Sequence, residues 1–251
     1  MSRGRAIATA PTCAHGWEHF DAAKGVCLRC PPPPLRRPDF LALAEAAMGH
    51  APSAEALQRA TERDESEQRE ARLLESGVRG AITDEDFEGL IAGTLLETHA
   101  IRSVQRWRNV RSGSATKPMT TLVLVGLTGR GKTLAGGWLL AAIGGKYATA
   151  ETLRRSVVST HWRDAAPLEQ LIKARCVVID DAGGELDANS AAAAMFELVN
   201  RRSGHSRSWT LITANMPQEE FRERYGERTI RRIEHQGAII EVSGEDLRRK
   251  A

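Results

Sequence analysis

The stretch Thr120-Thr121-Leu-Val-Leu-Val-Gly126-Leu-Thr-Gly129-Arg-Gly131-Lys132-Thr133 decides how this chain folds. An apolar, mostly branched run predicts a buried strand, and a glycine-rich turn follows it directly. The turn ends in G-x-x-x-x-G-K-[ST], and a helical pattern continues from there. Glycines allow the backbone to curl so that consecutive N–H groups point inward around a phosphate. A buried strand before the turn favours a phosphate-binding loop over an ordinary glycine turn.

The loop predicts ATP with Mg²⁺ as the ligand. Lys132 is placed to reach the β- and γ-phosphate oxygens, and the Thr133 hydroxyl is placed to bind Mg²⁺. The following helix adds the positive end of its dipole. The predicted nucleotide-binding residues of the loop are Gly126, Gly129, Arg130, Gly131, Lys132, Thr133 and Leu134.

Composition places few limits on function. The chain has 251 residues, 41% of them hydrophobic, and a formal net charge of +3. This is ordinary for a protein with one buried core, and the mild charge does not by itself indicate a nucleic-acid partner. The sequence shows neither an apolar run long enough to span a bilayer nor a secretory signal, so we expect a cytoplasmic protein without a membrane partner.

Residues 1–30 predict a small zinc-binding module. Cys13, His15, Cys27 and Cys30 form the pattern C-x-H-x11-C-x2-C. Two close pairs of N/S ligands suit the tetrahedral geometry of structural zinc, with a short hairpin between the pairs. His19 is a competing ligand for His15. The alternative is an unstructured tail with scattered thiols.

Residues 31–82 are expected to be a linker. Four prolines, Pro31–Pro34, predict an extended, semi-rigid spacer, and 40–48 is helical in composition. The densely charged segment 54–75 indicates either a solvated helix or a disordered tether, and not a core element. Residues 83–251 then form the nucleotide-binding domain. Its first element is predicted to be one helix, which begins after Thr83 and carries apolar positions as far as Val104.

Two later strands end in polar residues. The buried strand at 176–181 ends in Asp180 and Asp181, and the strand at 209–215 ends in Asn215. Asp180 is predicted to hold the Mg²⁺ shell, and Asp181 to orient or deprotonate the attacking water. Ligands meet the carboxyl ends of parallel strands, so Asn215 is expected between the γ-phosphate and this acidic pair. Its alternative role is to form a turn.

Four segments, taken in order, resemble the AAA+ family of DnaC/DnaI-type replicative helicase loaders and their IstB transposition ATPase relatives. The segments are 126–133, 177–185, 210–217 and 225–233. The resemblance covers about residues 85–251. It implies an α/β fold with a central parallel sheet flanked by helices. The sequence departs from the family pattern at Ala214, where the family usually has Ser, and at Arg231, where the family often has Asp.

The resemblance also implies residue roles. Asp180 and Asp181 would form Walker B, and Asn215 would be sensor I. Arg228 or Arg232 would be the arginine finger, donated to the ATP of a neighbouring subunit. Arg248 falls where sensor II would lie. Such a finger implies a nucleotide-dependent homo-oligomer, because an arginine on a C-terminal helix does not easily reach its own γ-phosphate.

The leading hypothesis from sequence is an ATP-hydrolysing helicase loader. It would bind a replicative DNA helicase through its N-terminal region and single-stranded DNA through its ATPase domain. Arg201, Arg202 and Arg207 form a basic cluster that either lines a single-strand path or is simply solvated. The alternative function is an IstB-like ATPase that binds DNA and recruits a transposase.

Overall fold

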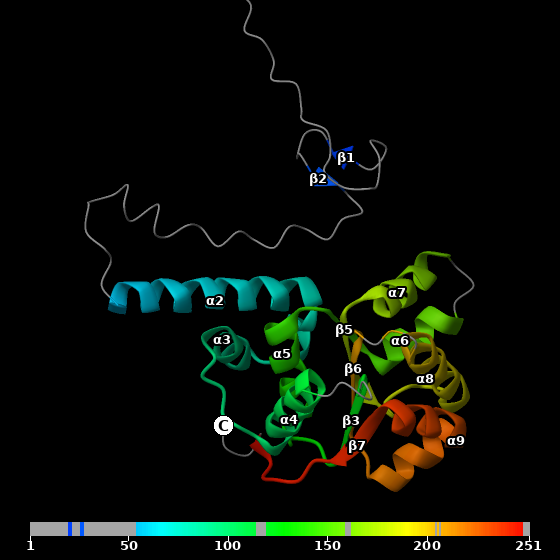
Figure 1. The fold of residues 1–251 in the computed structure, drawn as a ribbon. Helices are drawn as coiled ribbons and strands as arrows, with labels where there is room; N and C mark the ends of the chain where they lie inside the picture. The colour runs from blue at the N-terminus through cyan, green and yellow to red at the C-terminus, as the bar shows by residue number, and fades with distance from the viewer. Residues whose placement is uncertain are drawn as a thin grey trace, which may run out of the picture. The chain divides into compact units, whose positions relative to one another are not determined.

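The computed structural model describes residues 20–21, 26–27, 54–113, 119–158, 162–203, 205 and 207–247. Its centre is a five-stranded sheet in which every neighbouring pair is parallel (Figure 1). In spatial order the strands are β4 (Lys146–Thr149), β5 (Cys176–Ala182), β6 (Trp209–Ala214), β3 (Thr121–Val125) and β7 (Gly237–Glu241). The predicted α/β fold with a parallel sheet is confirmed.

The sequence of β3 explains why it lies inside the sheet and not at an edge. All five of its residues are buried, as expected for a parallel strand that is covered on both faces. Its neighbours are β6 on one side and β7 on the other, with Leu122 opposite Leu211 and Ala238. Because the strands are parallel, β3, β5 and β6 all end at the same edge of the sheet. The phosphate loop, the acidic pair and Asn215 therefore follow strands that end side by side.

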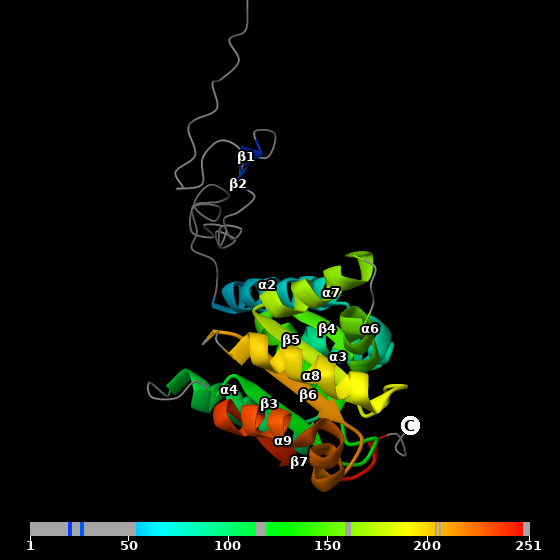
Figure 2. The same ribbon diagram turned by 90° about the vertical axis from the view of Figure 1, so that its right-hand side faces the viewer.

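Helices cover both faces of the sheet, and the two cores that result are separate. On one face lie α3 (Asp84–Ala92), α4 (His99–Gly113) and α5 (Lys132–Ile143), which pack on Leu122, Leu124 and Val178. The other face carries α6 (Ala150–Val158), α7 (Trp162–Lys173), α8 (Ala188–Ser203) and α9 (Gln218–Gln236), seen in front in Figure 2. The connection after β3 thus crosses one face, and those after β5 and β6 cross the other. In parallel sheets, ligands bind at the carboxyl ends of strands whose connections leave toward opposite faces.

The single helix predicted after Thr83 is wrong, because two helices occupy that stretch. Helix α3 begins with the Thr83 hydroxyl accepting a hydrogen bond from Asp86 N, and it ends at Gly93 with a left-handed φ of 75°. Only glycine adopts this conformation at little cost, so it closes a helix efficiently. The chain then runs without regular structure to α4.

The charged segment folds as helix α2 (Ala54–Ser76), followed by the 3-10 turn η2 (Val78–Ala81). Leu73 and Val78 are fully buried in the core with α3, α4 and α5. The Arg72 guanidinium donates hydrogen bonds of 3.1 and 3.0 Å to the carbonyl oxygens of Ala141 and Ala142 at the end of α5. The prediction that this segment contributes nothing to the core is therefore wrong for its last turn.

Near the N-terminus, β1 (Phe20–Asp21) pairs with β2 (Val26–Cys27) as a short antiparallel ladder. This matches the hairpin expected between the two pairs of zinc ligands. The predicted helix at 40–48 lies outside the described residues. Among the residues that the structure describes, no helix has both the length and the apolar character needed to cross a membrane.

Candidate nucleotide-binding site

The phosphate loop joins β3 to α5 and is closely packed. Gly129 and Gly131 both have φ of 75°, and Gly131 is the N-cap of α5. A Cβ on Gly126 would lie 2.8 Å from the Val242 carbonyl oxygen, and one on Gly129 would collide with the Asp246 carboxylate. Glycine is thus required at these positions by conformation and by space. Arg130 is half-buried in the turn, and Leu134 is buried in the core.

Lys132 is only 4% exposed. Its ammonium donates hydrogen bonds of 2.9 Å to the Gly126 carbonyl oxygen and 2.7 Å to the Leu127 carbonyl oxygen. The ammonium therefore lies inside the loop, in contact with two of its backbone carbonyl oxygens. Phosphate oxygens are stronger acceptors for a buried ammonium. This donor set fits the phosphates of a nucleotide.

Asp180 lies at the end of β5 and accepts hydrogen bonds from three hydroxyl groups. The Thr133 hydroxyl is 3.1 Å from each carboxylate oxygen, and the Tyr147 hydroxyl is 2.8 Å from Oδ2. The Thr213 hydroxyl donates to Oδ1. A carboxylate beside the hydroxyl of the phosphate loop is the oxygen-rich arrangement that Mg²⁺ prefers. The predicted pairing of Thr133 with Asp180 is thus present in the fold.

The structure brings in Tyr147, which the sequence analysis did not single out. It stands on the edge strand β4, and β4 pairs with β5 so that Thr149 lies opposite Asp180. Burial, reinforced by the negative charge of Asp180, raises the pKa of Tyr147. The hydroxyl therefore keeps its proton and serves as a donor to the carboxylate. No local sequence pattern links the two residues, because they meet only through strand order.

Asp181 adopts a left-handed backbone conformation, with φ of 58°, and is exposed. This conformation is costly for a residue with a Cβ and is often found at functional sites. Two contacts from β6 and its end hold it. Asp181 N donates to the Thr213 hydroxyl at 3.2 Å, and Asn215 Nδ2 donates to Asp181 Oδ1 at 2.8 Å. The acidic pair and Asn215 thus meet as the sequence predicted, on one edge of the sheet.

The segment after β7 crosses the phosphate loop. Val242 N donates to the Val125 carbonyl oxygen at 2.8 Å, and Leu247 N donates to the Gly129 carbonyl oxygen at 2.9 Å. The Asp246 carboxylate lies against Gly129. A negative side chain therefore stands beside the loop that the sequence assigns to phosphate. Arg248, the predicted sensor II residue, follows directly but lies outside the described residues.

Both arginine-finger candidates are exposed on the second half of α9, beyond a kink at Gly226. The Arg228 guanidinium lies 4.1 Å from the centre of the Phe196 ring, and Arg232 donates to Asn200 Oδ1 at 2.8 Å. Helix α9 begins beside the carboxyl end of β6 and returns to the opposite edge of the sheet, where the Gln236 carbonyl oxygen accepts from Thr120 N. Arg232 precedes Gln236 by four residues, so at a rise of about 1.5 Å per residue it lies about 6 Å along the helix axis from that far edge.

A buried carboxylate connects the loop after β5 to α9. Glu185 follows β5, and its side chain is 1% exposed. It accepts hydrogen bonds from Tyr225 OH at 2.6 Å, Arg224 Nη2 at 3.1 Å and Gly183 N at 2.8 Å. The sequence analysis included Glu185 in a matching segment but assigned it no role. Its contacts fix the first half of α9 to the loop that follows Asp181.

The basic cluster predicted at 201–207 does not exist as one surface. Arg202 is 1% exposed, and burial lowers its pKa to about 10. Its guanidinium makes five hydrogen bonds, to Thr210 Oγ1 and to the carbonyl oxygens of Leu171, Ile172, Ala174 and Trp209. The two N–H groups of Nη1 are shared among the Leu171, Ile172 and Ala174 carbonyl oxygens. Arg201 instead forms a 2.7 Å ion pair with Glu169. Arg202 is therefore not available to line a DNA path, and Arg201 is exposed but paired with an acidic side chain.

The predicted zinc ligands cannot be placed. Cys13, His15 and Cys30 lie outside the described residues, as does the alternative ligand His19, and of Cys27 only the strand β2 is described. Within the residues that are described, no group of three or more His, Cys, Asp or Glu side chains could hold a metal ion. Cys176 is fully buried, as expected for a core residue.

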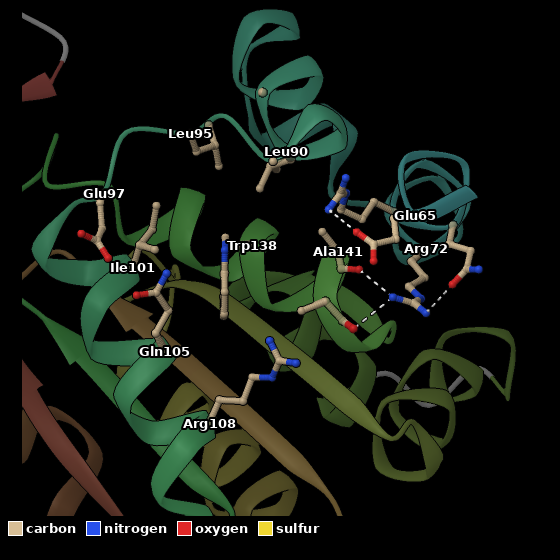
Figure 3. A pocket seen from close by; sticks show the side chains of 15 residues that line it. Glu65, Arg72, Leu90, Leu95, Glu97, Ile101, Gln105, Arg108, Trp138 and Ala141 are labelled. Carbon is tan, nitrogen blue, oxygen red and sulfur yellow. Dashed lines mark hydrogen bonds and ion pairs between the residues drawn. The ribbon is translucent and has the colours of Figure 1, made fainter. Parts of the chain in front are cut away.

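A hollow of about 680 Å³ lies among α2, α3, α4 and α5, on the face of the sheet that carries α5 (Figure 3). Trp138 stands at its centre, with the Arg108 guanidinium 5.7 Å from the ring centre. Glu65 and Glu97 line the same hollow as Arg72 and Arg108. Charged side chains of both signs therefore share its wall.

Comparison with protein families gives one match over most of the chain. The model described as "IstB-like ATP binding protein" matches residues 45–251. The match includes the phosphate loop, both acidic residues, Asn215 and the exposed arginines of α9. It begins before α2, so it also includes the charged helix whose last turn packs in the core. A search of curated proteins found no match.

Several solved structures are similar to the chain. The crystal structure of the DnaC helicase loader is 20% identical, with a TM-score of 0.48, over 59% of this chain and 92% of that one. The crystal structure of DnaI is 18% identical, with a TM-score of 0.46, over 61% and 86%. AMPPCP-bound DnaA from Aquifex aeolicus is 15% identical, with a TM-score of 0.45, over 62% and 51%.

Proposed function

Because the chain belongs to the family of IstB-like ATP-binding proteins and is an ATPase, we propose that it loads a replicative DNA helicase onto single-stranded DNA. The nucleotide-dependent part is supported by two contacts at one edge of the sheet, between Thr133 and Asp180 and between Asn215 and Asp181. Three segments far apart in sequence converge there. Such a site serves phosphoryl chemistry.

In this proposal the loop from Gly126 to Leu134 holds ATP, and Lys132 carries the charge that pairs with the phosphates. Thr133 and Asp180 hold Mg²⁺, which would neutralise charge that develops on the phosphates. Asp181 orients the attacking water, and Asn215 positions Asp181 through the 2.8 Å hydrogen bond between their side chains. Arg248 would reach the nucleotide from the segment that crosses the loop.

We assign the arginine finger to Arg228 or Arg232, acting on the ATP of a neighbouring subunit. Helix α9 carries both away from the edge of the sheet at which the chain's own phosphate loop lies. A second copy of the chain would therefore complete each site, and ATP would favour a homo-oligomer. Charge stabilisation by such an arginine accounts for large rate effects in phosphoryl transfer.

We assign to the N-terminal region the role of binding the helicase. Residues 1–30 would form a zinc module with Cys13, His15 or His19, Cys27 and Cys30 as ligands, and 31–82 would connect it to the ATPase domain at 83–251. A module of that size beyond a proline spacer suits a tethered protein contact. Metal analysis checks the module: one zinc per chain is expected, and a Cys27→Ser/Cys30→Ser variant that keeps its zinc would contradict it.

A second candidate function has a specific observation in its favour. The matching family model is named for IstB, and a transposition ATPase that binds DNA and recruits a transposase would use the same nucleotide site. The two functions differ in the protein partner. The upstream module and spacer, which lie largely before the matched residues, favour the loader.

The test is affinity purification of the full chain from its native host with ATP and Mg²⁺ present. The proposal expects a hexameric replicative helicase to be recovered and identified by mass spectrometry. The Cys27→Ser/Cys30→Ser variant should lose that partner while its ATPase activity is retained. Recovery of a transposase in place of the helicase would establish the second candidate and reject the loader.

A further inference from the structure

A basic cavity of about 940 Å³ lies at the edge of the sheet opposite the phosphate loop. Its basic side chains come from three places in the chain. Arg111 lies near the end of α4. Lys173 is the last residue of α7, and Arg175 lies between α7 and β5. His205 and Arg207 lie between α8 and β6. These turns meet because β5 and β6 are neighbours and begin side by side, with Cys176 opposite Trp209.

Positive charge gathers around the cavity. Among the residues that the structure describes, no acidic side chain lines it, and Lys173, Arg175 and Arg207 form no ion pair. Burial, with added repulsion from Arg175, lowers the pKa of Arg111 to about 10. Like charges held close together cost free energy that a bound anion would recover. The hollow in Figure 3 differs, since two glutamates share its wall.

The geometry favours phosphate groups over bases. Arg111 donates a 2.5 Å hydrogen bond to the Ser208 carbonyl oxygen, and its guanidinium lies 3.9 Å from the centre of the Trp209 ring. Trp107 packs against the same ring edge-to-face at 5.0 Å, and Trp209 is only 8% exposed. Single-strand binders that contact bases use open aromatic faces. Here the aromatic face is covered by a fixed cation.

We propose that this basic cavity binds the phosphodiester backbone of single-stranded DNA, with Arg175 and Arg207 as its exposed phosphate contacts. The proposal rests on the proposed function, which supplies the DNA. It places the strand on the edge opposite the nucleotide and replaces the cluster at 201–207, from which only Arg207 remains. Binding is then independent of base sequence and strongly dependent on salt.

The test measures fluorescence anisotropy of a labelled oligothymidine with the full chain, ATP and Mg²⁺, from 50 to 200 mM salt. The variant is Arg175→Ala/Arg207→Ala. Arg59→Ala/Arg63→Ala is the control, because it removes the same charge from side chains of α2 that are 78% and 82% exposed. Each phosphate contact on a single strand contributes roughly 0.7 to the slope of log affinity against log salt. Two lost contacts lower that slope by about 1.4, and affinity at 0.1 M salt by about 25-fold.

The control should change neither quantity, and both variants should retain wild-type ATPase activity and thermal unfolding. If Arg175→Ala/Arg207→Ala and wild type have equal affinity and equal salt slope, the cavity is not the DNA-binding site. That result would leave the loader function in place. Failure of the wild-type chain to bind any single strand would reject the DNA part of the proposed function itself. An abasic oligonucleotide should compete equally well. A requirement for bases, or a preference for duplex, would also overturn the proposal.

Discussion

The buried guanidinium of Arg202 offers a sharp test of the fold, because its neighbour Arg201 is a matched control. Both residues lie in the last turn of α8, and their side chains leave the helix about 100° apart because they are consecutive. Arg202 points inward and makes five hydrogen bonds, three of them to carbonyl oxygens near the end of α7. Arg201 points outward to Glu169.

The expected loss of stability follows from those bonds. A net contribution of about 1 kcal/mol per hydrogen bond predicts about 5 kcal/mol for Arg202→Ala. Breaking a buried charged network typically costs about 3–5 kcal/mol, so the two estimates agree. Arg202→Lys retains the charge but has at most three donors, so at least two bonds are lost, at a cost of about 2 kcal/mol. Arg201→Ala should cost less than about 1 kcal/mol, as exposed ion pairs do.

Urea unfolding followed by circular dichroism measures these differences. With an m-value of about 2 kcal/mol per M, Arg202→Ala should lower the midpoint of the main transition by about 2.5 M and Arg201→Ala by less than about 0.5 M. Equal midpoints for the two alanine variants would refute the structural role of Arg202. A Lys variant as stable as wild type would show that charge, and not hydrogen bonding, is what this position requires.

Three further outcomes concern the nucleotide site. Asp181→Ala should bind ATP normally but release phosphate at least about 100-fold more slowly, since the water loses its general base; unchanged turnover would contradict that role. Mixing Arg232→Ala chains with Lys132→Ala chains should restore part of the turnover that each lacks, and no recovery at any ratio would argue against this arginine acting in trans. Asp246→Asn should tighten ATP binding about fivefold in a fluorescent-nucleotide titration, because about 1 kcal/mol of repulsion near the phosphates is removed; an unchanged affinity would show that the carboxylate moves away at no cost.

Features that depend on neighbouring residues could be predicted from the sequence. The buried strand, the glycine turn and the helix after it follow from local conformational preferences. The same preferences put Asp180, Asp181 and Asn215 at strand ends. Parallel pairing then brings those ends to one edge, so the sequence could predict that these residues meet there.

Features that depend on strand order and helix phase could not be predicted. Tyr147 reaches Asp180 because β4 lies beside β5, which no local pattern reveals. The buried Leu73 makes a charged helix part of the core. In both cases a tertiary contact outweighs the composition of the segment. The break at Gly93 differs, because a glycine in the left-handed conformation ends α3 through local backbone geometry.

The phosphate loop shows the same division within one site. The sequence by itself determined its backbone, because only glycines adopt the left-handed turns at 129 and 131, and it determined that Lys132 and Thr133 follow them. Only the tertiary structure decided that Asp246 lies across the loop and that Arg202 is buried. It also decided that Arg175 and Arg207 share a cavity at the opposite edge. The physical reason is that local sequence sets backbone conformation, whereas the positions of distant charges depend on how the strands and helices pack.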